Sequence, residues 1–223
     1  ENTTGTVTLA STIDSSNDDI TFGAITITAL TTIDTNATDT TGDIIIGAVT
    51  GSNNSLTLDT TTSTGSADIT FNGDINLGTG ALTVTGDVVL GANVSVTATP
   101  SSGIGIRFND AINADSASSN DRTLTLNAGT AATIFALGNV GASEALAGLT
   151  VTQSNDASFT GSVDVSDSNS GTITLTDTTD GADITFSGAV TADTFTTAAQ
   201  GYDIFLNGDA TFANAVTFQN SGT

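Results

Sequence analysis

The sequence contains no cysteine, histidine, methionine, tryptophan or lysine, and its only basic residues are Arg107 and Arg122. Without cysteine the chain has no disulfides, no thiolate nucleophile and no thiolate metal ligand. Without histidine and lysine, the commonest catalytic bases and nucleophiles are missing as well. Phosphate binding needs clustered lysine and arginine, which this chain does not have. We therefore expect a protein that is not an enzyme and does not bind nucleic acid.

Residues that favour helices are also scarce, and no apolar run is long enough to span a bilayer. No signal peptide is recognisable. The chain carries 24 acidic residues and a net charge of −22, yet 37% of it is hydrophobic, unlike a disordered acidic tail. Its apolar residues are mainly Ile, Val, Leu and Phe, which suit pleated strands. The composition therefore predicts an all-β fold.

Strand-like phrases recur along the chain at a constant interval. The interval is 49 residues (for example 69 − 20) for three pairs: Val7–Leu9 and Leu56–Leu58, Ile20–Phe22 and Ile69–Phe71, Leu124–Leu126 and Ile173–Leu175. Aspartate precedes related phrases at Asp19, Asp43, Asp68, Asp87, Asp183 and Asp203. Steps between neighbouring phrases run from 19 to 25 residues (87 − 68 and 68 − 43), a length that fits one coil of a β-solenoid.

These repeats predict a single, continuous, parallel β-solenoid (β-helix) over residues 1–223, with coils of about 19–25 residues. The alternative is a β-sandwich, which also has short alternating strands but gives no reason for phrases to return at an identical interval. Two regions depart from the pattern. Residues 109–122 predict a polar excursion, with ion pairing among Arg107, Arg122, Asp110, Asp115 and Asp121. The Ala-Leu-rich stretch near 142–148 predicts a short helical turn.

Within each phrase, apolar residues alternate with threonine, which turns one face inward and the other toward solvent. We expect buried side chains at Ile20, Phe22, Ile69, Phe71, Ile184 and Phe186, and exposed ones between them at Thr21, Thr70 and Thr185. All ten phenylalanines are expected in the core. We expect equivalent inward positions in stacked coils, and so an aromatic ladder, for four of them: Phe22, Phe71, Phe108 and Phe186.

Some stretches resemble a known group of proteins. They are Gly138-Asn139-Val140-Gly141 followed by Leu146-Ala147-Gly148-Leu149-Thr150-Val151, and the closing run from Asp183 through Gly208–Phe212 to Val216-Thr217-Phe218. This style is similar to that of giant repetitive bacterial surface proteins, the filamentous-haemagglutinin-like and autotransporter-like adhesins. The resemblance implies a right-handed parallel β-helix, secretion to the cell surface, and a role in adhesion, matrix or filaments. It transfers no catalytic residue.

Two acidic stretches are candidates for calcium, which takes hard oxygen ligands from carboxylates and loop carbonyls. The candidate ligands are Asp164, Asp167 and Asn169 in the first stretch, and Asp177, Asp180 and Asp183 in the second. Neither stretch matches the EF-hand loop or the calcium-binding nonapeptide. An acidic hydrolase, using Asp18 with Asp19 or the second stretch, is the remaining catalytic alternative.

Taken together, these patterns predict an extracellular or cell-surface bacterial structural protein. Its partner is expected to be itself, joined end to end in a filament, matrix fibre or adhesin stalk, because Gly222-Thr223 at the end matches Gly5-Thr6 near the start. The alternative is an adhesive module that grips a glycan, ice or a host surface on a lateral face. Repeated Thr-x-Thr pairs, such as Thr123/Thr125 and Thr172/Thr174, motivate that alternative.

Overall fold

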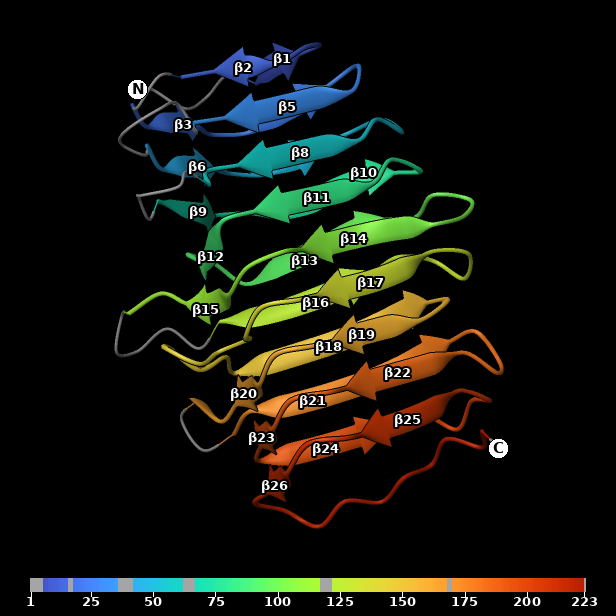
Figure 1. Cartoon of the computed structure of the whole chain (residues 1–223). Helices are drawn as coiled ribbons and strands as arrows, with labels where there is room; N and C mark the ends of the chain where they lie inside the picture. The colour runs from blue at the N-terminus through green and yellow to red at the C-terminus, as the bar shows by residue number, and fades with distance from the viewer. Residues whose placement is uncertain are drawn as a thin grey trace.

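The computed structural model of the chain describes residues 6–15, 18–35, 42–61, 67–116, 122–167 and 170–222, apart from the side chain of Asp177. These residues build a stack of coils, with β1 (Val7–Leu9) at one end and β26 (Ala210–Phe212) near the other (Figure 1). Every pairing between the described strands is parallel. The predicted parallel β-solenoid is confirmed, and the β-sandwich alternative is wrong.

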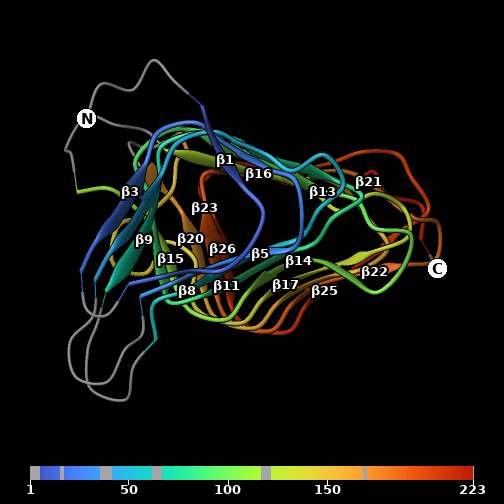
Figure 2. The ribbon, with the colours of Figure 1, turned by 90° about the horizontal axis from the view of Figure 1, so that it is seen from above.

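The strands form three sides around the core when the stack is viewed along its axis (Figure 2). The first side is a nine-stranded sheet, sheet A: β1, β4 (Ile25–Ile27), β7 (Val49–Thr50), β10 (Ile75–Gly78), β13 (Val94–Ala98), β16 (Thr123–Asn127), β18 (Gly148–Ser154), β21 (Thr172–Thr178) and β24 (Thr194–Thr197). The second is the nine-stranded sheet B: β2 (Ile13–Asp14), β5 (Thr31–Asp34), β8 (Leu56–Asp59), β11 (Leu82–Thr85), β14 (Ile104–Phe108), β17 (Thr133–Ala136), β19 (Ala157–Phe159), β22 (Asp183–Phe186) and β25 (Asp203–Leu206).

The third side consists of two shorter sheets. Sheet C has five strands: β3 (Ile20–Phe22), β6 (Ile44–Ile46), β9 (Asp68–Phe71), β12 (Asp87–Leu90) and β15 (Ile112–Ala114). Sheet D has three: β20 (Val163–Val165), β23 (Val190–Ala192) and β26. Val140 forms single parallel bridges to Ile112 and to Val163, so it links the two sheets into one side.

Alternation of apolar and polar residues accounts for the core. In sheet B, for example, Ile184 and Phe186 point inward and are fully buried, while Thr185 between them points outward and is half-buried. The predicted burial is confirmed for Ile20, Ile69, Phe71, Ile184 and Phe186. Phe22 is only half-buried, because β3 is the outermost strand of sheet C and has no neighbour on its other side.

The 49-residue interval corresponds to two coils in two of the three pairs. Ile20 aligns with Ile44 and then with Ile69, and Leu124 aligns with Leu149 and then with Ile173. In the third pair the two phrases lie in different sheets. Val7 lies in sheet A and Leu56 in sheet B; the residue two coils after Val7 is Val49, only 42 residues on (49 − 7). Coils differ in length, so an equal interval does not always return to the same side.

The expected aromatic ladder is wrong in its arrangement. Phe22 and Phe71 lie in sheet C, whereas Phe108 and Phe186 lie in sheet B. The closest ring stacking joins Phe186 to Phe159 of the preceding coil, with ring centroids 4.9 Å apart. The expectation that every phenylalanine is in the core is also wrong. Phe205 and Phe218, in the last coils, are 43% and 51% exposed, and Phe22, Phe135 and Phe212 are half-buried.

The described parts of the two regions expected to break the pattern contain a regular strand in one case and bends in the other. Within 109–122, β15 alternates inward Ile112 and Ala114 with outward Asn113, and residues 117–121 of the expected excursion lie outside the described residues. Near 142–148 the described chain forms bends and no helix. Its backbone groups bond to other coils instead: the Leu146 N–H donates to the Asp164 carbonyl and the Ala147 N–H donates to the Arg122 carbonyl.

Stacked turns between sheets B and D depend on glycine. A Cβ atom added to Gly188 would lie 2.5 Å from backbone atoms of Gly161, and one added to Gly208 would lie 2.4 Å from those of Gly188. Any side chain at these positions would therefore force the coils apart at this corner.

Candidate functional site

A column of aspartates lies at the start of the strands in sheet C. The Asp43 N–H donates to Asp19 Oδ1 at 2.9 Å, and the Asp68 N–H donates to Asp43 Oδ1 at 3.0 Å. Asp87 continues the column, in register with Asp68, and its Oδ1 accepts the Ala111 N–H at 3.1 Å. Each of these bonds joins one coil to the next. The carboxylates therefore act as coil-to-coil acceptors for backbone groups where a strand begins.

Stacking places like charges close together in this column. Successive strands lie about 4.8 Å apart, so neighbouring carboxylates repel each other. Partial burial of the Asp68 carboxyl raises its pKa, although the residue as a whole is exposed, and the adjacent charges of Asp43 and Asp87 raise this pKa further. The column thus combines hydrogen bonds that hold the coils together with a charge repulsion that works against them.

Sheet B carries two further sets of aligned aspartates. Asp14, Asp34 and Asp59 follow one another in register at the ends of their strands. Asp183 and Asp203 are in register at the starts of theirs, and Asp156 Oδ1 accepts the Asp183 N–H at 3.0 Å. Asparagine can replace aspartate in the same role, because it also offers an Oδ1 acceptor. Asn139 Oδ1, for example, accepts the Ser162 N–H at 2.9 Å from the next coil.

The two groups of calcium candidates lie on different sides of the coils. Asp164 is on β20 of sheet D, where its Oδ1 accepts the Ser166 hydroxyl at 2.6 Å, and Asp167 follows two residues after this strand ends. Asp180 and Asp183 lie at the turn from sheet A to sheet B, and Asp180 Oδ1 accepts the Gly201 N–H at 3.1 Å. Asn169 and the side chain of Asp177 lie outside the described residues.

No group of three or more acidic side chains that could hold a metal ion occurs in the described part of the chain. The carboxylate oxygens of Asp164 and Asp180 accept hydrogen bonds from protein groups. Binding of calcium at these stretches stays a prediction of the sequence.

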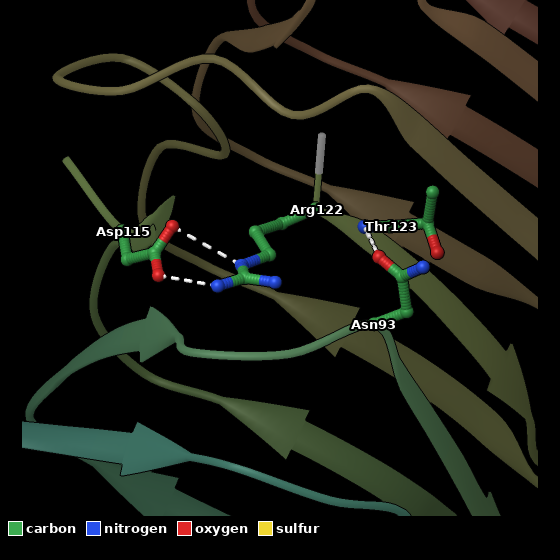
Figure 3. Close-up of polar contacts among 4 residues, drawn as sticks. All are labelled: Asn93, Asp115, Arg122 and Thr123. Atoms are coloured by element: carbon green, nitrogen blue, oxygen red, sulfur yellow. Dashed lines mark hydrogen bonds and ion pairs between the residues drawn. The ribbon is translucent and has the colours of Figure 1, made fainter. Parts of the chain in front are cut away.

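Arg122 makes its contacts at the border between two sheets. Figure 3 shows the Arg122 guanidinium facing the Asp115 carboxylate, with Nε donating to Oδ1 at 3.1 Å and a terminal nitrogen donating to Oδ2 at 2.6 Å. The two side chains are only 18% and 25% exposed. The predicted ion pairing is confirmed for this pair, and both side chains are largely shielded from water.

The Arg122–Asp115 pair spans the chain between the end of β15 and the start of β16. Next to it, the Thr123 N–H donates to Asn93 Oδ1 at 3.0 Å, which fixes the entry into sheet A (Figure 3). Arg107 has a different environment: its Nε donates to Asn109 Oδ1 at 2.7 Å and its guanidinium lies over the Phe135 ring. Asp121 lies outside the described residues.

The two ends of the stack expose residues at inward positions. At one end Val7 is exposed, and Ile13 and Phe22 are half-buried. At the other end Ile204 and Leu206 of β25 are half-buried, although their partners one coil earlier, Ile184 and Phe186, are fully buried. In the part of the chain that the structure describes, the inward columns of the core are therefore only partly covered at both ends.

A cavity of about 300 Å³ lies at the second end, lined by Ile204, Leu206, Phe218 and Asn220. The segment after β26 follows the next coil over sheet A, where Thr217 bridges to Thr196. It then approaches the start of β25, where Asn220 Nδ2 donates to the Tyr202 carbonyl. The Asn220 Oδ1 atom is buried and has no hydrogen-bond partner. β25 is the last strand of sheet B, and its outer edge pairs with no other strand in the described part of the chain.

Comparisons with known protein families, with curated proteins and with solved structures give no match. In the described part of the chain, no helix has the length and apolar character required to cross a membrane.

The sequence shows that aspartates recur before the strand phrases, but it does not show what they bind. Their role as coil-to-coil acceptors was missed. The signal was present, since Asp19, Asp43 and Asp68 recur at steps of one coil immediately before an apolar residue. The sequence alone offers no reason for an acceptor side chain at these positions. The reason is that Asp19 and Asp43 each accept a backbone N–H from the next coil.

Proposed function

We propose that this chain is a non-catalytic structural segment of an extracellular bacterial filament, matrix fibre or adhesin stalk. In this role further coils stack on its ends, whether they belong to another copy or to a neighbouring segment of one longer chain. The likeness of the repeats to those of bacterial surface adhesins supports the extracellular setting. The absence of histidine, cysteine and lysine from the whole sequence supports a non-catalytic role.

The observation that carries this proposal is the incomplete burial of inward-facing residues in the outermost coils. Ile204 and Leu206 continue columns that are fully buried one coil earlier in the chain. At the opposite end, Ile13 and Phe22 belong to columns that are fully buried one coil later. Covering such positions is favourable by about 25 cal/mol per Å² of apolar surface removed from water. The open edges of the outermost strands also offer backbone groups to an incoming strand.

Charge opposes this assembly. The nine strands of sheet A span about 43 Å at 4.8 Å per strand. A net charge of −22 over that length gives about one charge per 2 Å, similar to duplex DNA. Ends of two copies therefore approach each other only when salt or divalent cations screen them. End joining is expected to increase with ionic strength and to weaken when a chelator is added at low salt.

The test compares two neighbouring residues of β25. Leu206→Asp places a charge at an inward position of the end coil, and Phe205→Asp places the same charge at the adjacent outward position. Electron microscopy and light scattering at high salt should show rods of variable length for the unmodified chain and for Phe205→Asp, and single coil stacks for Leu206→Asp. The proposal fails if the unmodified chain stays monomeric at high concentration and high salt.

A further inference from the structure

The outward surface of sheet A differs chemically from the rest of the solenoid. Its central column consists of small hydroxyl side chains that are in register over successive coils: Ser95, Thr125, Thr150, Thr174 and Thr196. The other outward-facing side chains described on these strands are also uncharged, and nearly all are Thr, Asn or Gln. We refer to this outward surface of sheet A as the threonine face.

The lack of charge among the described outward side chains of this face is unusual for a chain with 24 acidic residues. Sheet B has the same number of strands but carries outward Asp14, Asp34, Asp59, Asp183, Asp203 and Arg107. Sheet C carries Asp68 and Asp87. The strands of sheet A contain one acidic residue, Asp177 of β21, whose side chain is not described. The other side chains on these strands are uncharged. A second acidic molecule therefore meets the least repulsion on the threonine face.

Strand spacing makes this face complementary to a copy of itself. Strands in a solenoid lie perpendicular to its axis at about 4.8 Å, so every copy has the same periodicity along its length. Two such faces can be brought together about 10 Å apart with their side chains interdigitated, as in paired cross-β sheets. Threonine suits such a contact because its methyl group packs and its hydroxyl can both donate and accept a hydrogen bond.

We propose that the threonine face is a lateral self-association surface and that its partner is the threonine face of a second copy of this chain. Other partners fit less well. Nucleic acid needs clustered cations, and stacking on sugars or bases needs outward aromatic rings; the described strands of sheet A present neither. Pairing of two single chains through this face does not depend on the end joining proposed above.

The area of the face predicts weak pairing of single chains. About 43 Å of length and a width of three to four residues give about 500 Å² for each copy, compared with about 800 Å² per partner in a stable complex. The contact area increases in proportion to the number of coils. Rods that are also joined end to end would therefore associate side by side more strongly than single chains, because many weak contacts act together.

The chain has no cysteine, so single cysteines can report contacts directly. Ser95→Cys lies on β13, the central strand of sheet A, where it meets its own counterpart in either a parallel or an antiparallel pair. Ser158→Cys, on β19, is the matched control on sheet B and is also half-buried. A short bismaleimide reagent spans the gap of about 10 Å between facing sheets. Labelling with a monofunctional maleimide corrects for differences in thiol reactivity.

The expected result is a covalent dimer of Ser95→Cys that forms at least several-fold faster than that of Ser158→Cys, with a larger difference at high salt. Adding Thr125→Glu, Thr150→Glu and Thr174→Glu to the Ser95→Cys chain should abolish this advantage. The control adds the same charge on sheet B through Thr57→Glu, Thr83→Glu and Thr185→Glu, and should leave it intact.

Circular dichroism establishes that both triple variants remain folded before they are compared. Equal cross-linking rates for Ser95→Cys and Ser158→Cys would overturn the proposal. So would equal losses from the two triple variants, because general repulsion would then explain both. Leu206→Asp can be added to the Ser95→Cys chain to prevent end-to-end joining. Cross-linking through the introduced cysteine that persists in this double variant would show that lateral pairing is independent of the proposed stacking function.

Discussion

Sheet A and the side formed by sheets C and D stack the same coils, but their outward side chains differ. Sheet A presents hydroxyl and amide side chains, whereas the starts of the sheet C strands carry Asp19, Asp43, Asp68 and Asp87, several of which accept backbone N–H groups from the next coil. Many of the acidic residues thus occupy positions where a carboxylate has a structural use. Among the side chains that the structure describes on the strands, this arrangement leaves sheet A without charge.

The largest effect should come from the core that both sides share. Phe186→Ala removes a fully buried ring that stacks on Phe159, and we expect the free energy of unfolding to fall by about 3–5 kcal/mol. Thr185→Ala, on the outward side of the same strand, should change it by less than about 0.5 kcal/mol. Urea unfolding followed by circular dichroism measures both, and similar losses would contradict the inward and outward assignment.

Arg122 connects the two sides, since it precedes β16 of sheet A and binds Asp115 after β15 of sheet C. Arg122→Ala leaves a largely shielded carboxylate without this partner, so we expect a loss of about 1–3 kcal/mol. Arg107→Ala removes a contact over the Phe135 ring and should cost about 0.5–1 kcal/mol. The order of the two variants in thermal unfolding tests this, and the reverse order would contradict it.

The aspartate column should tolerate loss of charge better than loss of its acceptor. Asp43→Ala leaves the Asp68 N–H without the Asp43 Oδ1 acceptor, and we expect a cost of about 1 kcal/mol. Asp43→Asn keeps an oxygen in place and reduces repulsion, so its stability should equal or exceed that of the unmodified chain. Equal stabilities for Asp43→Ala and Asp43→Asn in urea unfolding would contradict the acceptor role.

On the threonine face, Thr26→Ala should change the free energy of unfolding by less than about 0.5 kcal/mol.

The smallest effect concerns pH. The pKa of Asp68 is raised above 3.8 in the folded chain, so the folded state holds this proton at a pH where the unfolded state releases it. The contribution of Asp68 to stability is therefore most favourable below pH 3.8 and declines as the pH rises through the raised value. Asp68→Asn cannot ionise. It should be more stable than the unmodified chain at neutral pH, by less than about 1 kcal/mol.

Urea unfolding of the two chains between about pH 3 and pH 7 measures this difference. The advantage of Asp68→Asn should disappear at the acid end of the range, where the carboxyl of the unmodified chain is also neutral. A difference that stays constant across the range would mean that the substitution acts through packing and not through charge.

The sequence predicted the solenoid and its inward residues because both depend on local alternation, which is repeated in every coil. It did not predict which side a phrase occupies. Val7 and Leu56 belong to similar phrases but lie in different sheets, because the intervening turns differ in length. The bends near 142–148 were also unpredictable, since Leu146 and Ala147 find their hydrogen-bond partners in coils that are distant in sequence. The candidate end surface could be inferred only as a repeat boundary; its cavity and the buried Asn220 oxygen required coordinates.

The hydrogen bonds between coils run along the axis of the stack, as from the Ile20 N–H to the Asp43 carbonyl and from the Val163 N–H to the Ala189 carbonyl. A force that pulls the two ends apart is therefore directed along these bonds and breaks them one coil at a time, beginning with an outermost coil. A released coil of about 20 residues extends to about 70 Å, whereas it adds only about 4.8 Å to the stack. A tethered rod of this kind would lengthen in large steps under tension and dissipate mechanical work while its remaining coils stay paired.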